Sequence, residues 1–176
     1  MLILIILWGL LSFWQLNHIL AVNIAISVIA VMAIFFTLFE VAPLFLLIFL
    51  SFISSYALYG FLFQFSLPIW LIMVALLIIF GYIYLYVEQK IGILGNKRLI
   101  YLVLFCLITL EVFLSLSYFL INPLSKSLII GVVSYLFVGF SYTVLAKHES
   151  KLSTYLFVAT LMGGIIFLTS SWGGSI

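Results

Sequence analysis

The chain has 176 residues, of which 68% are hydrophobic and 6% are charged, and its formal net charge is +2. A water-soluble domain has roughly 45–50% apolar and about 25% charged residues, so this composition excludes a soluble globular protein. The small net charge, without a basic patch in the sequence, also excludes a nucleic-acid-binding protein, which needs a strongly positive surface. The composition instead predicts an all-α, polytopic transmembrane helical bundle.

Long apolar runs predict about seven membrane-spanning helices in a single transmembrane domain over residues 1–176. A spanning helix needs about 20 apolar residues. Six runs approach this length, at residues 19–39, 41–61, 67–87, 99–121, 127–146 and 152–172. A shorter run at 2–16 precedes them. It could cross a thinned bilayer, oligomerise or lie at the interface, and in the last case the chain would have six spans.

The loops between these runs predict the orientation of the chain. The loops at 88–98 and 147–151 lie on one side of the membrane and hold five of the six basic residues. The segment 122–126 lies on the other side and holds only Lys126. Because Lys and Arg are enriched in short cytoplasmic loops, we expect loops 88–98 and 147–151 in the cytoplasm of a bacterial cell.

Glu40 is the first candidate for a special role in chain order. It lies before Pro43, a residue that suits the first turn of a helix, so its carboxylate could cap that helix by interacting with the helix dipole. If the helix instead extends back to Glu40, this residue aligns with Ser51 and Ser55 in a polar strip.

Glu111 lies near the middle of the run 99–121, where a charged side chain costs at least roughly 2.5–3.5 kcal/mol. Ser115, Tyr118 and Asn122 follow at i+4, i+7 and i+11, so one helix face would carry all four polar side chains. We expect this face to point into the bundle or into a wet cavity. It could form a proton or cation site or a substrate anchor, or it could be a polar peg bonded to neighbouring helices.

Small residues recur at helical spacing in the last two runs, and this pattern is typical of close helix packing. In the run 127–146 they are Ser127, Gly131, Ser134 and Ser141, and in the run 152–172 they include Ala159, Gly163 and Gly164. These residues could join helices within one chain or between two copies.

Residues that usually carry catalysis or bind metals are few. His18 and His148 fall in loops without Cys or Asp at ligand spacing, so we expect no metal site and no cofactor. The sequence has no nucleophile elbow, no zinc-protease motif and no phosphate-binding glycine loop. An enzyme is therefore the least favoured interpretation.

The stretch EVFLSLSYFLINPLSK, from Glu111 to Lys126, and the later Ser171-Trp172-Gly173-Gly174 resemble integral membrane proteins of small-genome, uncultured bacteria. The resemblance covers the C-terminal part of the chain. Those proteins have no assigned activity, so the resemblance implies a bacterial inner membrane and nothing about catalysis.

Three functions fit these patterns, in this order. The first is a non-enzymatic membrane subunit or scaffold, supported by the short loops and the packing residues. The second is a small transporter or channel, proton-coupled through Glu111. The third is a membrane enzyme that acts on lipid. The expected partners are membrane lipids and either another membrane protein or a second copy of the chain, with no nucleic acid.

Overall fold

The computed structural model describes residues 1–91, 98–146 and 160. Within these ranges the chain forms six α-helices and no strand. The helices are α1 (Leu2–Leu16), α2 (Leu20–Phe39), α3 (Pro43–Phe63), α4 (Ile69–Ile91), α5 (Arg98–Ser117) and α6 (Pro123–Ala146). Five of them, α2 to α6, are long and apolar enough to cross a membrane, while α1 is a shorter apolar helix. The expected helical membrane bundle is confirmed, and the predicted span 152–172 lies outside the described helices.

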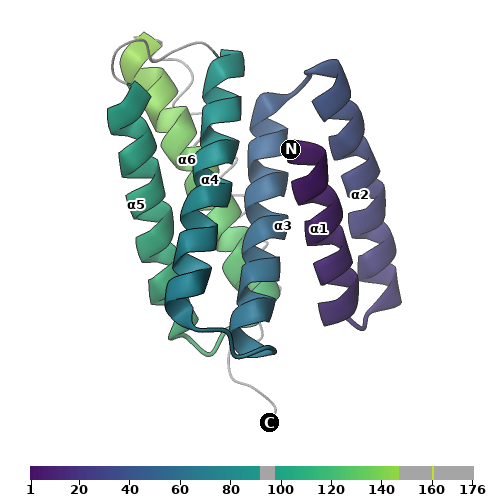
Figure 1. Cartoon of the computed structure of the whole chain (residues 1–176). Helices are drawn as coiled ribbons and strands as arrows, with labels where there is room; N and C mark the ends of the chain where they lie inside the picture. Colours follow the sequence, from purple (N-terminus) through teal and green to yellow (C-terminus); the bar gives the residue numbers. More distant parts are fainter. Residues whose placement is uncertain (92–97, 147–159, 161–176) are drawn as a thin grey trace.

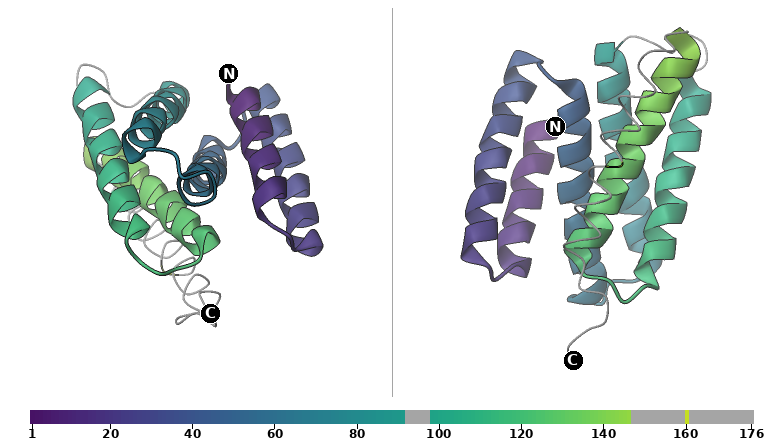
Figure 2. Two further views of the ribbon diagram at one scale, coloured as in Figure 1. Left: turned by 60° about the horizontal axis from the view of Figure 1, so that its bottom comes forward. Right: turned by 180° about the vertical axis from the view of Figure 1, so that it is seen from behind.

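The helices run alternately up and down, and consecutive helices are antiparallel neighbours (Figure 1). Helices α3, α4, α5 and α6 form a closed ring, because α3 contacts α4, α4 contacts α5, α5 contacts α6 and α6 contacts α3. The α1–α2 hairpin packs on the outside of this ring through α3 (Figure 2). Helix α3 is therefore the central element and is buried along most of its length, whereas α2 and α5 are mostly exposed.

Helix–helix contacts depend on small residues at two places. A Cβ atom added at Gly131 on α6 would lie 3.3 Å from the carbonyl oxygen of Ile48 on α3, so a larger residue would push the two backbones apart by a few tenths of an ångström. A Cβ atom at Gly9 on α1 would lie 2.8 Å from the Ile53 side chain, on the opposite face of α3. Both α1 and α6 therefore pack closely on helix α3.

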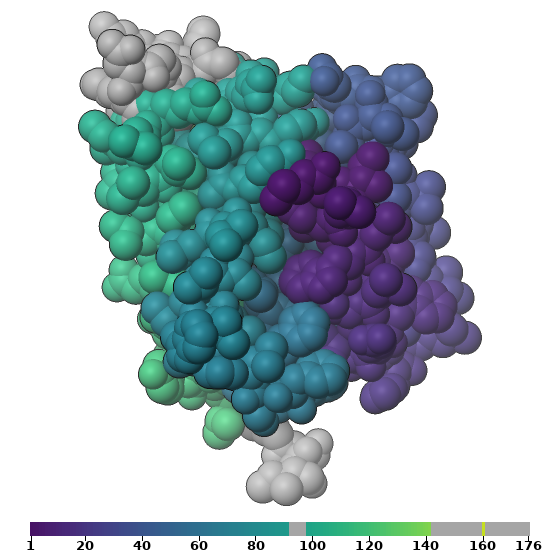
Figure 3. Space-filling model, viewed as in Figure 1, coloured from purple at the N-terminus to yellow at the C-terminus, as the bar shows by residue number. Residues whose placement is uncertain are grey.

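Aromatic side chains fill the ring of four helices. The Phe105 ring on α5 has its centroid 4.9 Å from that of Tyr84 on α4 and 5.5 Å from that of Phe137 on α6. Such pairs add about 0.5–1.5 kcal/mol each beyond the area that they bury. The space-filling view shows that α1, α2, α4 and α5 form most of one face of the molecule (Figure 3).

Two ion pairs connect neighbouring helices at the end of the bundle where α2 and α4 end and α5 begins. Lys90 Nζ lies 2.6 Å from Glu40 Oε1, and Arg98 Nε lies 2.7 Å from Glu88 Oε2. Glu40 itself has a left-handed backbone with φ of 58° and ends α2. These pairs join the α2–α3 connection to α4 and the end of α4 to the start of α5.

Candidate functional site

Glu111 and Ser115 lie on the exposed face of α5. The opposite face of this helix carries Phe105, Thr109 and Phe113, which are all buried. At about 3.6 residues per turn, a side chain two positions from Thr109 and two from Phe113 must point away from both. The expectation that the Glu111 face points into the bundle is therefore corrected, because the large aromatic side chains occupy the interior instead.

Tyr118 and Asn122 do not continue the stripe of Glu111, because α5 ends at Ser117 and not at Ile121. The Asn122 side chain accepts a hydrogen bond from the backbone N–H of Leu124 at 3.0 Å. Asn122 is thus the cap of α6, which begins at Pro123 and not at the predicted Ser127. Tyr118 is 82% exposed and lies beside the end of α5. The four predicted residues therefore form no single helix face.

Glu40 does not cap α3, because that helix begins at Pro43 after a left-handed Ala42, and Glu40 instead pairs with Lys90. Ser51 and Ser55 are fully buried inside α3, and the Ser55 hydroxyl donates to the Ser51 carbonyl oxygen at 2.7 Å. The bundle therefore separates Glu40 at the surface from the two buried serines.

The small residues of α6 lie at its contact with α3. Ser127, Gly131, Ser134 and Ser141 are all buried, and α3 and α6 pack along their length. The Ser127 and Ser141 hydroxyls each donate to a carbonyl oxygen one turn earlier in α6. Ala159, Gly163 and Gly164 lie outside the described residues.

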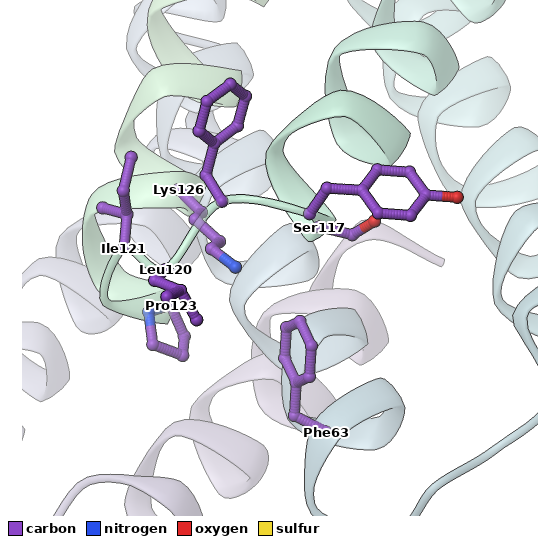
Figure 4. Close-up of a pocket in the computed structure, with 8 residues that line it drawn as sticks. Phe63, Ser117, Leu120, Ile121, Pro123 and Lys126 are labelled. Carbon is purple, nitrogen blue, oxygen red and sulfur yellow. The ribbon is translucent and has the colours of Figure 1, made fainter. Parts of the chain in front are cut away.

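A cavity opens at the end of the bundle opposite the two ion pairs, where α3 and α5 end and α6 begins. Its volume is about 590 Å³. It is lined by Phe63, Ser117, Tyr118, Phe119, Leu120, Ile121, Pro123 and Lys126. Most of these side chains are apolar, and Figure 4 shows that Phe63 and Lys126 approach the cavity from different helices.

Lys126 is the charged residue of this cavity. Although its side chain ends in an ammonium group, the residue is only 3% exposed. Its Nζ lies 4.6 Å from the centroid of the Phe63 ring and 5.4 Å from that of Tyr59, so the two rings of α3 partly enclose the cation. The ion pairs of the described residues do not include Lys126.

Tyr59 holds this aromatic enclosure in place. Its hydroxyl donates to the Phe113 carbonyl oxygen at 3.0 Å, and its ring stacks on the Phe113 ring with centroids 4.2 Å apart. The Phe63 ring is nearly parallel to that of Tyr59, with centroids 6.1 Å apart. Helix α5 thereby fixes the two aromatic residues of α3 that contact Lys126.

Sequence reasoning placed Lys126 in a loop and overlooked this site. The signal was present in Asn122-Pro123, since Asn is a preferred N-cap and Pro a preferred first helical residue. Read in this way, α6 begins at Pro123 and Lys126 falls in its first turn. The partners of Lys126 on α3 lie far away in the sequence, and no local pattern points to them.

The described residues include no group of three or more His, Cys, Asp or Glu side chains that could hold a metal ion. The chemistry of the cavity is therefore that of a single cation in apolar surroundings.

Comparisons with protein-family models, with curated proteins and with solved structures find no match to this chain.

Proposed function

We propose that this membrane protein is a non-enzymatic subunit that binds a transmembrane helix of a partner protein through the outer face of α5. The observation that carries the proposal is the exposure of Glu111 within this spanning helix, six residues before its end at Ser117. A carboxyl group that faced hydrocarbon would be strongly unfavourable. A partner helix that offers a basic or hydrogen-bonding side chain at this depth would remove that cost.

The surroundings of Glu111 support a helical partner. Leu107 and Leu104 lie four and seven positions earlier on the same face, and both are exposed. Ser115 lies one turn later and is exposed as well. An apolar stripe that ends in a carboxyl and a hydroxyl group matches the side of a transmembrane helix that packs on another helix. Among the described residues, no ion pair satisfies Glu111.

We also propose in which membrane the chain lies and which end of the bundle faces the cytoplasm. We place the chain in a bacterial cytoplasmic membrane, with the Glu40–Lys90 and Glu88–Arg98 pairs at the cytoplasmic end. The excess of Lys and Arg in the loops at this end supports the assignment. The Lys126 cavity then opens at the outer end.

Co-purification tests the proposed subunit role. The tagged full chain is extracted from its native membrane in a mild detergent, and bound proteins are quantified by mass spectrometry. Glu111→Leu should reduce a stoichiometric partner at least about tenfold, the change that corresponds to about 1.4 kcal/mol. Val31→Ala, at an exposed apolar position of α2 and away from this face, should retain the partner and serves as the control.

Two results would contradict the subunit role. The first is a wild-type chain that purifies as a monomer without a stoichiometric protein partner. The second is the pure chain reconstituted in liposomes and carrying a proton flux that Glu111→Gln abolishes. That flux would establish the alternative, a self-sufficient proton-coupled transporter, in which Glu111 works as a proton site on the surface of α5.

A further inference from the structure

We propose that the cavity at the start of α6 binds the phosphate headgroup of an anionic phospholipid, with Lys126 as its counter-charge. This inference rests on a different part of the molecule from the subunit role and does not depend on it. The cavity volume of about 590 Å³ lies within the range of about 300–1,000 Å³ that is usual for small-molecule sites.

The first step is the state of the Lys126 cation. An ammonium group has three hydrogen-bond donors, and the faces of Tyr59 and Phe63 accept the charge only through their ring quadrupoles. Among the described residues no carboxylate pairs with it. Because Lys126 is only 3% exposed and pairs with no anion of the described residues, we expect an anion from outside the chain to bind it.

The second step is the position of Lys126 in the first turn of α6. The helix dipole places partial positive charge at the N-terminus, where a further cation is unfavourable and an anion is favourable. Lys126 donates its backbone N–H to the Asn122 carbonyl oxygen, so its side chain starts directly at this positive end. The helix end and the ammonium group therefore both attract an anion. Without a bound anion, these two positive groups would repel each other.

The third step identifies the anion as a lipid. The cavity wall is mostly apolar, and its loop residues Phe119 and Leu120 are 58% and 99% exposed. A free phosphate ion gains nothing from such walls, whereas a phospholipid places its phosphate on Lys126 and its glycerol and acyl carbons against these side chains. Figure 4 shows Leu120, Ile121 and Lys126 around one space, which brings apolar and cationic groups together.

Native mass spectrometry of the delipidated full chain tests the site. The probes are phosphatidylglycerol, phosphatidylcholine and inorganic phosphate. We expect saturable binding of phosphatidylglycerol, at least tenfold weaker binding of phosphatidylcholine, and no competition by inorganic phosphate at millimolar concentration. Equal binding of the two lipids, or displacement of phosphatidylglycerol by phosphate, would overturn the assignment of an anionic lipid.

Variants link this binding to the cavity. Lys126→Met keeps an unbranched stem against Phe63 and Tyr59 and should weaken phosphatidylglycerol binding at least tenfold, while Lys126→Arg should restore it. Lys90→Met at the other end of the bundle is the matched control and should leave binding unchanged. Unchanged binding in Lys126→Met would contradict the proposal.

A second variant keeps the test valid if Lys126→Met fails to fold. Leu120 is 99% exposed, so replacing it does not disturb the core. Leu120→Asp adds a negative charge to the cavity wall and should weaken phosphatidylglycerol binding, whereas Leu120→Asn of nearly the same shape should retain most of it. If Leu120→Asp binds phosphatidylglycerol as tightly as Leu120→Asn, the headgroup does not lie in this cavity.

Discussion

At the scale of single residues, the interior of the bundle combines apolar packing with a few specific hydrogen bonds. Tyr59 shows the combination, because its ring packs against those of Phe113 and Phe63 while its hydroxyl donates to the Phe113 carbonyl oxygen. This hydrogen bond joins the side chain of α3 to the backbone of α5 across the ring of helices. The contact fixes the Tyr59 ring that faces Lys126 and therefore matters for the site as well as for the fold.

Removing this hydroxyl should lower the stability of the bundle modestly. Tyr59→Phe keeps the ring stack and deletes one hydrogen bond, so we expect a loss of about 0.5–1.5 kcal/mol in the free energy of unfolding. Tyr56→Phe is the matched control, since Tyr56 is also buried on α3 and its hydroxyl forms no hydrogen bond among the described residues. Reversible unfolding in mixed micelles measures both variants, and equal stability of the two would show that the Tyr59 bond contributes nothing.

At the scale of helices, the sequence predicts which segments form helices better than it predicts which face of each helix points into the bundle. Each described helix corresponds to an apolar run, because length and hydropathy suffice to identify a spanning segment. The rotation of α5 was predicted wrongly, since polar and aromatic residues both offered a face for the interior and Phe105 and Phe113 fill it better than Glu111 does. The Lys126 site depends on contacts between α3 and α6, which no local pattern encodes.

The boundary between α5 and α6 depends on one side chain. Asn122 accepts the Leu124 N–H, and its removal leaves that donor unsatisfied at the start of α6. We expect Asn122→Ala to lower the free energy of unfolding by about 1 kcal/mol, while Asn122→Asp, which also caps helices well, retains most of it. Thermal unfolding in detergent compares them, and an Asn122→Ala chain as stable as Asn122→Asp would show that the cap has no energetic role.

At the scale of the whole molecule, charge is divided unequally between the two ends of the bundle. Four of the described charged side chains form the two ion pairs at one end, where they bridge α2, α4 and α5. The other end holds Lys126 inside its aromatic enclosure. Partly exposed pairs such as Glu40–Lys90 contribute only about 0–1 kcal/mol to stability. The basic residues in the loops at this end support the proposed orientation, in which this end lies inside.

Cysteine labelling in intact cells tests that orientation directly. With Cys106 replaced by Ser, Leu120→Cys places a fully exposed thiol at the proposed outer end, and Glu40→Cys places one at the proposed inner end, where the native side chain is 62% exposed. A membrane-impermeant maleimide should label Leu120→Cys in intact cells and Glu40→Cys only after lysis. The reverse labelling pattern would show that the bundle has the opposite orientation and that the Lys126 cavity opens to the cytoplasm. The cavity would then bind an anionic lipid of the inner leaflet, and the loop charges would not determine the orientation.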